Sequence, residues 1–501
     1  MHVVFKKHFL ILLIVPKFNK MRKVLLTYCL FVTSLMGFTQ SKTYSDLQNE
    51  LTKLPEFKNA IVGLYAVNIS TGEKMFDYNS NLSLAPASVF KIIPTSLALE
   101  LLGPEHKFKT ELAYSGSVSS AGILNGDLYV IGYGDPCLGS PRFAAHYNSN
   151  GELLQKWVNE VKKLGIKEIS GDIVADISYF AEIPIPDTWI WEDIANYYGN
   201  PGSALNYMDN LYYLHFKTGN TDGSPTSIIK TEPEDIGITF NNKVTSSSTT
   251  GDESFIYYTN NKTECEVRGT LPWNKSDFTI KGSMPEPEMY LIQSFNNKLR
   301  SNGITVKGKE KKVADPDSKT SRKVFYTTYS PELLEIVEVT NLKSFNLYAE
   351  MFARHIEKKT NKSYSDAVID FWKSKAVNTD GLIVEDACGL SRFNGLTAFQ
   401  MVEMLKYMRS KSVYGEKFFN TLPVAGTSGT LSRYCVGTKA QNRVHAKSGS
   451  MARVRAYAGY ILNADGEEIV FCFIANNYQC PNYRVRKIFE NLFVDIANIS
   501  D

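Results

Sequence analysis

The stretch "APASVFKIIP", residues 85–94, contains a serine and a lysine at a spacing that suits nucleophilic catalysis. Ser88 and Lys91 are three residues apart, and residues at this spacing on a helix share one face, about 5 to 6 Å apart at Cβ. A serine hydroxyl is a weak nucleophile until a base removes its proton, and a lysine serves as that base only when it is neutral. Partial burial beside another cation lowers the pKa of a lysine in the required direction.

The Ser-x-x-Lys pair is weak by itself, because a polar second-turn serine and a solvated lysine give the same pattern. The chain holds a second copy at residues 227–230, between Gly/Pro turns, where no helix is predicted. At the first copy, Pro86 suits the first helical position and Gly103-Pro104 ends the run, which predicts a helix over 86–102. Ser88 would then lie near the helix N-terminus, where free N–H groups favour negative charge.

Two further short motifs each have two candidates, which differ in chain order and in predicted local structure. The Ser-x-Asn candidates are residues 294–296 and 344–346, and the Lys-[Ser/Thr]-Gly candidates are residues 217–219 and 447–449. Residues 217–219 come before both Ser-x-Asn candidates and leave a predicted strand for a turn. Residues 294–296 lie inside a predicted helix, on its expected solvent side. Residues 344–346 stand between two helical stretches, and residues 447–449 enter the strongest predicted hairpin, where a glycine lets a ligand approach the backbone closely.

The ordered set of Ser88 and Lys91, Ser344-Phe345-Asn346 and Lys447-Ser448-Gly449 resembles the penicillin-binding proteins. Three further stretches, "YVIGYGDPCLG", "DACGLSRFN" and "LPVAGTSGTLSRY", are similar to those of the low-molecular-mass class C group. These are the D-alanyl-D-alanine carboxypeptidase/endopeptidases of the penicillin-binding protein 4 type. The long separation between the two motif serines also fits that group, which has extra domains there. Ser448 replaces the commoner threonine and keeps the hydroxyl.

The resemblance implies a role for each matching residue near the nucleophile. Ser88 would be acylated, and Lys91 would be its general base. Ser344 would relay a proton towards the leaving amine, and Asn346 would hold the amide of the substrate.

The resemblance also implies a substrate-binding strand. Lys447 would supply positive potential that keeps the base neutral and attracts the terminal carboxylate of D-Ala-D-Ala. The hydroxyls of Ser448 and Ser450, on either side of Gly449, would bind that carboxylate. The backbone N–H groups of Ser88 and Ser450 would form an oxyanion hole, where the loss of one donor typically costs about a hundredfold to a thousandfold in rate.

The function implied is a serine-type D-Ala-D-Ala carboxypeptidase/endopeptidase that trims or cleaves peptidoglycan through an acyl-enzyme, with no metal or cofactor. Peptidoglycan stem peptides would be its substrates and β-lactams its covalent inhibitors. Two alternatives stay open: a β-lactamase, which needs a carboxylate-activated water, and a catalytically silent wall-binding scaffold. A Ser-His-Asp hydrolase is disfavoured, because no Asp partner is visible for His215, His355 or His445 and no Gly-x-Ser-x-Gly elbow has the required spacing.

The pattern of elements predicts an α+β fold in which one domain is split by a long insertion, and the resemblance implies that this split domain is β-lactamase/transpeptidase-like. Hairpins are predicted near both chain ends, each with a flanking helix, so one antiparallel sheet could join them, beside a helical subdomain. The catalytic domain is predicted at residues 41–109 and 281–501, and a large, mainly β insertion at residues 110–280. The lysine-rich run at residues 307–323 is expected to be an exposed connector.

Composition and the N-terminal segment bear on location and partners. The 501 residues are 43% apolar and 21% charged. A formal charge of +3 is too small to indicate nucleic-acid binding, and no basic cluster is interleaved with aromatic residues. Residues 1–40 are predicted to be a signal-peptide region, with Met21 as an alternative start, rather than a membrane anchor, because the apolar run is shorter than the roughly 20 residues of a span. The mature protein would be exported to the periplasm or cell envelope without a transmembrane span. A homo-oligomer and the pairing of the cysteines stay open.

Overall fold

The computed structural model describes residues 42–147, 152–180, 182–259, 263–315 and 321–500. The chain divides into two units, residues 1–43 and residues 44–501, and the elements described below belong to the second. The predicted signal-peptide region, residues 1–40, lies outside the described residues. None of the helices in the described part of the chain has the length and apolar character that a membrane span requires.

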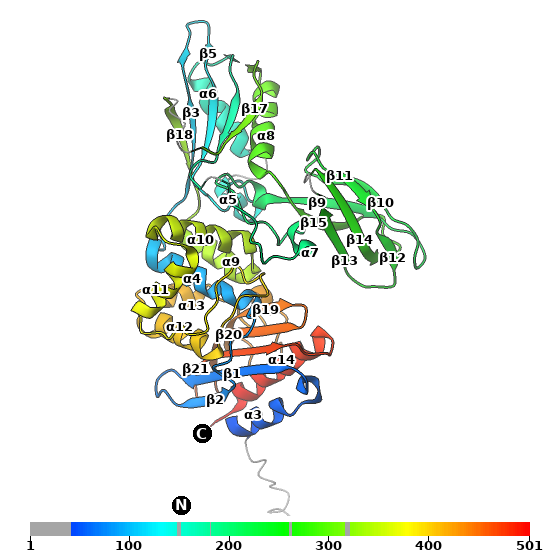
Figure 1. The fold of residues 1–501 in the computed structure, drawn as a ribbon, viewed down its shortest axis with the longest axis vertical. Helices are drawn as coiled ribbons and strands as arrows, with labels where there is room; N and C mark the ends of the chain where they lie inside the picture. The colour runs from blue at the N-terminus through cyan, green and yellow to red at the C-terminus, as the bar shows by residue number, and fades with distance from the viewer. Residues whose placement is uncertain (1–41, 148–151, 181, 260–262, 316–320, 501) are drawn as a thin grey trace, which may run out of the picture. The chain divides into compact units, whose positions relative to one another are not determined.

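Both ends of the chain contribute strands to one five-stranded antiparallel sheet, in the order β19-β20-β21-β1-β2 (Figure 1). Its strands are β1 (Ile61–Asn68), β2 (Lys74–Tyr78), β19 (Val444–Met451), β20 (Val454–Leu462) and β21 (Glu468–Asn476). β1 pairs with β21 along its whole length, from Ile61 opposite Asn476 to Asn68 opposite Ile469. The sheet therefore joins the two predicted hairpins, and the predicted α+β fold class is confirmed.

Helices α14 (Asn482–Asn498) and α3 (Tyr44–Thr52) cover one face of this sheet (Figure 1). The contact is aromatic: the ring centroids of Phe473 and Phe489 are 6.3 Å apart, and those of Tyr457 and Phe493 are 5.3 Å apart. The apolar residues of α14 that are buried in this cluster are Val485, Phe489, Leu492, Phe493 and Ile496, while Ile488 is partly buried. Burial of these large rings supplies much of the hydrophobic stabilisation of the sheet.

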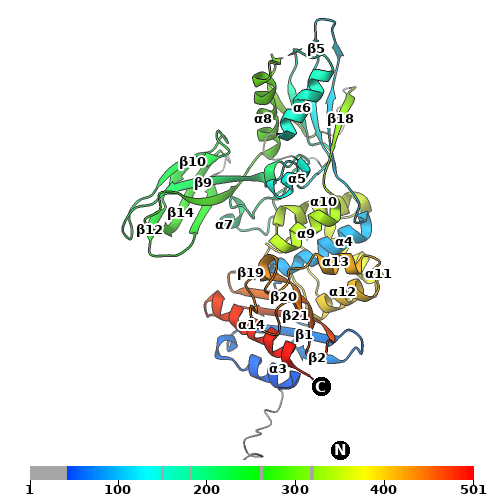
Figure 2. The same ribbon diagram turned by 180° about the vertical axis from the view of Figure 1, so that it is seen from behind.

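A group of helices lies against the other side of the sheet, with α12 contacting β1 and β21 (Figure 2). The group consists of α4 (Ile92–Leu102), α9 (Leu333–Lys343), α10 (Asn346–Thr360), α11 (Tyr364–Ser374), α12 (Ala398–Ser410) and α13 (Gly415–Asn420). α4 is the central member, since every residue from Ile92 to Leu99 is buried and α9, α10 and α11 contact it. An all-round apolar helix is stable only when it is surrounded in this way.

The predicted helix over residues 86–102 is wrong in its first turn. Residues Ala87–Lys91 form a 3₁₀ helix, η2, and the α-helix begins at Ile92. Pro94 explains the change, because it has no N–H to donate to the Phe90 carbonyl. With the α-helix starting at Ile92, Pro94 falls in its first turn, where no intrahelical partner is required. Ser88 therefore lies on a tighter turn than the sequence pattern predicts.

A second five-stranded sheet, with the order β17-β8-β6-β3-β18, is separate from the sheet that the two chain ends share. Its strands are β3 (Lys109–Tyr114), β6 (Leu128–Gly132), β8 (Ile173–Asp176), β17 (Glu310–Val313) and β18 (Lys323–Tyr329). α6 (Glu152–Lys163) and α8 (Pro287–Ser301) pack together beside it, with Trp157 edge-on to Phe295 at 5.4 Å.

The predicted insertion boundary at residue 280 divides this sheet. β17 pairs with β8 and β18 pairs with β3, so strands from both sides of that boundary form one structure. We propose that the insertion extends to about residue 329. The lysine-rich run is also more than a connector, because its residues Glu310–Val313 form the short edge strand β17. Charged side chains on an edge strand discourage pairing with another chain.

The remaining strands form three smaller sheets. One has β4 (Ser117–Val118), β5 (Ile123–Asn125), β7 (Glu168–Ile169) and β16 (Thr305–Val306). Another has β9 (Leu211–Lys217), β10 (Ser227–Glu232) and β15 (Phe278–Ser283), and the last has β11 (Thr239–Asn242), β12 (Thr245–Ser247), β13 (Glu253–Tyr258) and β14 (Glu264–Pro272). Short helices are α5 (Ala144–Tyr147), α7 (Trp191–Ile194), η1 (Pro55–Phe57), η3 (Pro141–Phe143), η4 (Met208–Asn210) and η5 (Gly429–Leu431).

The rejected motif copies lie in ordinary structural positions. Residues 227–230 belong to strand β10, and residue 217 ends strand β9, as the pattern predicts. Asn296, expected on the solvent side of its helix, is instead buried and donates a hydrogen bond from Nδ2 to Glu310 Oε1 at 2.5 Å. The strand that carries Glu310 covers this part of α8, which the sequence pattern did not indicate.

We expect Phe489→Ala to lower the free energy of unfolding by about 3–5 kcal/mol, because it removes a fully buried ring between α14 and the sheet. Tyr483→Ala on the same helix is the control, since that ring is 69% exposed. Urea titration followed by circular dichroism measures both. Equal midpoints for the two variants would contradict the assignment of this helix face to the core.

Candidate active site

The predicted catalytic and binding residues come together from three elements: η2, the break between α9 and α10, and strand β19. A cleft of about 890 Å³ is lined by Ser88, Ser344, Asn346, Ser448 and Ser450. Residues that are far apart in the sequence therefore share one cleft. Lys91 and Lys447 are fully buried beneath it.

The nucleophile candidate and the base candidate are in direct contact. Lys91 Nζ donates a hydrogen bond to Ser88 Oγ at 2.9 Å and another to the Cys388 carbonyl at 2.6 Å. The half-buried serine is reached from the cleft, while the lysine is not. Because side chains at i and i+3 eclipse each other in a 3₁₀ helix, η2 brings the pair together without the predicted α-helix.

Ser344 and Asn346 lie at the break between two helices. Ser344 ends α9 in the left-handed conformation, with φ at 57°, and Asn346 begins α10. Lys447 Nζ donates to Ser344 Oγ at 2.8 Å and to the Ser448 carbonyl at 2.8 Å. Asn346 Nδ2 donates to the Tyr198 carbonyl at 2.8 Å.

Gly449 allows strand β19 to pack directly against the turn that carries Ser88. A Cβ at this position would lie 2.7 Å from the Pro86 carbonyl oxygen and 3.0 Å from the Ser88 nitrogen. The sequence pattern attributed this glycine to the approach of a ligand, whereas the atoms nearest to it belong to the chain itself. Ser448 Oγ donates to Thr430 Oγ1 at 2.8 Å, and Ser450 is exposed.

The two buried lysines have different electrostatic surroundings. Burial lowers the pKa of both, and the positive charge of Lys91 lowers that of Lys447 further. Around Lys91 the effect of burial is opposed by Cys388, Asp386 and Glu350, which raise its pKa. The acidic neighbours of Lys91 therefore oppose the effect of burial on its pKa, whereas at Lys447 the neighbouring lysine adds to that effect.

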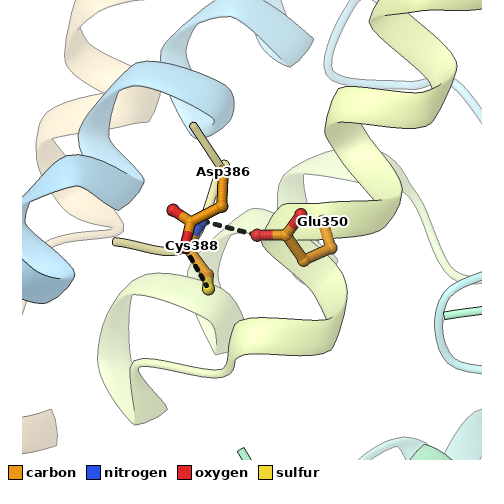
Figure 3. A group of neighbouring side chains, drawn as sticks. All are labelled: Glu350, Asp386 and Cys388. Atoms are coloured by element: carbon orange, nitrogen blue, oxygen red, sulfur yellow. Dashed lines mark hydrogen bonds between the residues drawn. The ribbon is translucent and has the colours of Figure 1, made fainter. Parts of the chain in front are cut away.

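Glu350 is a residue of the site that sequence reasoning missed. Glu350 Oε1 accepts a hydrogen bond from the backbone N–H of Cys388 at 2.7 Å (Figure 3). It also accepts one from the backbone N–H of Ala387 at 3.0 Å. The Cys388 carbonyl in turn accepts the hydrogen bond of Lys91. Glu350 thus fixes the peptide that holds the base. It lies four residues after Asn346 on α10, and this i, i+4 spacing was the available signal.

Asp386 closes the loop on which Cys388 lies. Its carboxylate accepts hydrogen bonds from the N–H of Gly389 at 2.7 Å, from Asn394 Nδ2 at 2.7 Å and from Trp189 Nε1 at 2.8 Å. Glu350, Asp386 and Cys388 hold three potential metal-ligand atoms within 4.8 Å of one another. Because the carboxylate oxygens already accept these hydrogen bonds, the group has a clear role in shaping the loop.

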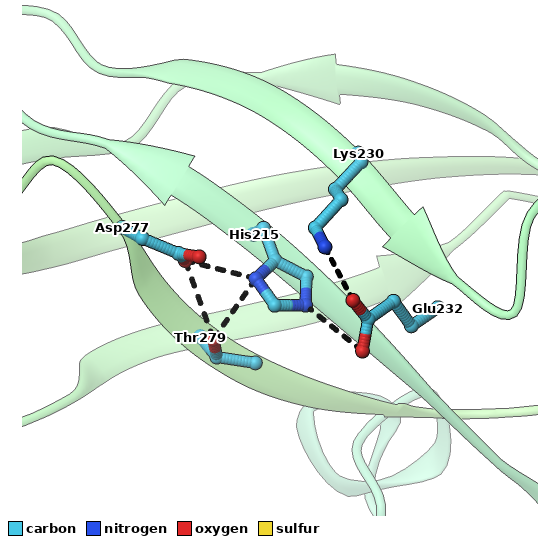
Figure 4. A network of polar contacts seen from close by, with 5 residues as sticks. All are labelled: His215, Lys230, Glu232, Asp277 and Thr279. Atoms are coloured by element: carbon cyan, nitrogen blue, oxygen red, sulfur yellow. Dashed lines mark hydrogen bonds and ion pairs between the residues drawn. The ribbon is translucent and has the colours of Figure 1, made fainter.

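The tertiary structure gives His215 the acidic partner that the sequence pattern lacked. His215 Nδ1 lies 2.8 Å from Asp277 Oδ1 and 3.1 Å from Thr279 Oγ1, and Nε2 lies 3.6 Å from Glu232 (Figure 4). These residues belong to or adjoin strands β9, β10 and β15.

The three histidines considered from the sequence all have structural contacts away from the nucleophile. His355 contacts the Gly134 carbonyl through Nε2 at 3.0 Å, and His445 stacks on Phe419. Within the described ranges none of the three bonds to Ser88. The site is thus built on lysine, not histidine, as the base candidate.

Comparison with known families decides the identity of this arrangement. The model of the D-Ala-D-Ala carboxypeptidase 3 (S13) family matches residues 43–492. The chain belongs to this family. It is a D-Ala-D-Ala carboxypeptidase, and the resemblance inferred from the motifs is confirmed.

Two relatives cover most of the carboxypeptidase. A D-alanyl-D-alanine carboxypeptidase of Actinomadura sp. (strain R39) is 31% identical over 445 residues, which are 85% of this chain and 80% of the relative. D-alanyl-D-alanine carboxypeptidase DacB of Haemophilus influenzae is 26% identical over 461 residues, which are 89% of this chain and 92% of the relative.

A solved structure agrees with the fold of the carboxypeptidase. Penicillin-binding protein 4 (dacB) of H. influenzae has a TM-score of 0.77 and 25% identity, and the match covers 91% of this chain and all of that one. A second structure of that H. influenzae protein, with a TM-score of 0.72 and 24% identity over 91% of this chain and 99% of that one, was solved in complex with a β-lactam.

We expect Glu350→Gln to shift the pH dependence of hydrolysis by the carboxypeptidase. The Glu350 carboxylate raises the pKa of Lys91, so a neutral amide should lower it, and the base should become neutral at lower pH. The acidic limb of kcat/KM for a D-Ala-D-Ala peptide should therefore move to lower pH, since kcat/KM reports the ionisations of the free enzyme. Glutamine keeps an acceptor oxygen for the two N–H groups.

The difference between the pH profiles of wild type and Glu350→Gln should appear only above about pH 7. Burial and the neighbouring Asp386 raise the pKa of Glu350 to about 7, so wild type and variant carry the same charge at this position well below that pH. Glu338→Gln, an exposed position on α9, is the control and should leave the profile unchanged. A uniform loss of rate at all pH values would show that Glu350 acts only on the shape of the loop.

Proposed function

We propose that this carboxypeptidase removes the terminal D-Ala of peptidoglycan stem peptides through an acyl-enzyme on Ser88. The observation that supports this most is the 2.9 Å hydrogen bond between Lys91 Nζ and Ser88 Oγ, with the lysine fully buried and its pKa lowered. A lysine of lowered pKa in contact with a serine hydroxyl is the arrangement that serine activation requires.

In the proposed reaction, Ser88 Oγ attacks the carbonyl carbon of the penultimate D-Ala as its proton passes to Lys91. The C–N bond of the tetrahedral intermediate then breaks, and the leaving amine takes up a proton. Ser344 is suited to relay this proton, because it lines the cleft and its hydroxyl accepts a hydrogen bond from Lys447 Nζ at 2.8 Å. Water then attacks the ester carbon and releases the shortened peptide and Ser88.

Binding of the substrate is proposed to decide which lysine carries the proton. In the free protein Lys91 has carboxylates nearby, and Lys447 has its pKa lowered by burial and by Lys91. A substrate carboxylate bound near Lys447 would favour the charged form of that lysine. The charge of Lys447 would then leave Lys91 neutral and ready to act as the base.

The amide and the oxyanion of the substrate also have candidate partners. Asn346 Nδ2 is already bonded to the Tyr198 carbonyl, which leaves its side-chain oxygen to accept an N–H of the substrate. The contact of Gly449 with the Ser88 turn brings the second half of β19 next to the Ser88 N–H. This proximity supports the N–H groups of Ser88 and Ser450 as the oxyanion hole.

We further propose that β-lactams acylate Ser88 and that the protein works outside the cytoplasm. A lactam carbonyl presents the same electrophile to the serine, and the H. influenzae relative has been solved with a β-lactam. Peptidoglycan lies in the cell envelope, so an enzyme that acts on it requires export to the periplasm or envelope. Cleavage of crosslinks between stem peptides uses the same chemistry with a different leaving amine.

Ser88→Ala should lower the hydrolysis of diacetyl-Lys-D-Ala-D-Ala by more than about a thousandfold and abolish covalent labelling by benzylpenicillin. Ser227→Ala is the matched control, since Ser227 belongs to the exposed second copy of the motif in β10. Mass spectrometry of the labelled protein locates the attached penicillin.

Three outcomes would overturn the proposal. Attachment of penicillin to another residue would exclude Ser88 as the nucleophile. Rapid turnover of penicillin by the wild type would favour a β-lactamase. Binding of peptidoglycan without any hydrolysis would favour a scaffold.

A further inference from the structure

We propose that Arg455 is a specificity residue that binds the α-carboxylate of the residue that leaves during hydrolysis. This inference rests on the proposed function, because it concerns the substrate of the same site. It restricts the preferred substrates to peptides in which the amino acid after the cleaved bond has a free carboxylate.

The strand register places Arg455 beside the proposed carboxylate-binding hydroxyls. β20 pairs antiparallel with β19, and Arg455 lies directly opposite Ser450. Residues opposite each other in such a pair have Cβ atoms about 4.5–5.5 Å apart on the same face of the sheet. Ser448 lies two residues before Ser450 and therefore on the same face. Arg455, Ser448 and Ser450 all line the cleft that holds Ser88.

The guanidinium of Arg455 has unused hydrogen-bonding capacity. Its Nε is buried and has no hydrogen-bond partner, and no ion pair of Arg455 is found in the part of the chain that the structure describes. The rest of the guanidinium has a neutral partner in Tyr478: burial raises the pKa of that hydroxyl, and the charge of Arg455 and a hydrogen bond from it oppose the rise. A buried donor without an acceptor is costly, so a ligand that supplies one gains affinity there.

The other arginines of the cleft differ in this respect. Arg142 Nε donates to Asp209 at 3.0 Å, and its guanidinium lies over the ring of Phe345. Arg392 acts on Asp193, whose pKa is raised by burial and lowered by this arginine. Both have a carboxylate of the chain to act on, whereas none is found for Arg455 among the described residues.

The chemistry of Arg455 matches a carboxylate. A guanidinium is always charged and presents a planar fork of donors that fits the two oxygens of a carboxylate. With the hydroxyls of Ser448 and Ser450 beside it, the same group would be bound from two sides. A leaving group with an amine but no carboxylate would leave Arg455 without its partner, and it should react more slowly.

The test compares diacetyl-Lys-D-Ala-D-Ala with the same peptide carrying a C-terminal amide. We expect the wild type to prefer the acid, and Arg455→Gln to lower kcat/KM for the acid by about tenfold to a hundredfold while leaving the amide within about twofold. Arg455→Lys should retain part of the preference, because it keeps the charge but loses the planar fork. Arg453→Gln is the matched control, an exposed arginine two residues earlier that does not line the cleft.

Two results would overturn the proposal for Arg455 and leave the proposed function intact. One is equal hydrolysis of acid and amide by the wild type, which needs no variant and so does not depend on correct folding. The other is an equal effect of Arg455→Gln on both substrates. Failure of the proposed function looks different, since the wild type would then hydrolyse neither peptide, or Ser88→Ala would remain active.

Discussion

The burial of Lys91 is the constraint on which the site depends. A lysine ammonium taken fully out of water is expensive unless it is paired and hydrogen-bonded, or unless it gives up its proton. Here the Nζ atom bonds Ser88 Oγ and the Cys388 carbonyl, so the lysine is satisfied while its pKa is lowered. Stability and reactivity therefore come from the same contacts.

Those contacts form only when several separate parts of the chain are correctly placed relative to one another. The Cys388 peptide is held by Glu350 on α10, and the loop that carries it is closed by Asp386. Gly389, at a φ of 77°, approaches the turn of Ser88 so closely that a Cβ would lie 2.1 Å from the Ala87 carbonyl oxygen. Gly449 makes the corresponding approach from β19. Because neither glycine has a side chain, the loop and the strand both pack closely against η2, and this packing fixes the position of Ser88.

The sheet shared by the two chain ends brings these parts together. β1 leads through β2 to the Ser88 turn, β19 carries Lys447, and β21 joins the two halves through its pairing with β1. The long insertion thus interrupts the catalytic domain in sequence without separating its parts in space. The insertion also contributes to the cleft directly, since the Tyr198 carbonyl holds the Asn346 side chain.

The sequence by itself determined which residues could do the chemistry. Ser88, Lys91, Ser344, Asn346 and the run from Lys447 to Ser450 were selected by order and by local pattern, because motif spacing and helix or strand periodicity are local properties. The same patterns predicted the α+β fold and the hairpins that form the shared sheet.

Only the tertiary structure decided how these residues interact, because burial and contacts between distant residues cannot be predicted from the spacing of residues along the chain. It turned the first helical turn into η2, placed Gly449 in contact with the turn of Ser88 and buried Lys91 and Lys447 next to each other. It placed β17 and β18 beside strands from early in the insertion, which no periodicity could indicate. Glu350 and Arg455 could be identified only from the structure for the same reason. Glu350 is identified by its hydrogen bond to a peptide 38 residues away, and Arg455 by its position opposite Ser450 in the neighbouring strand.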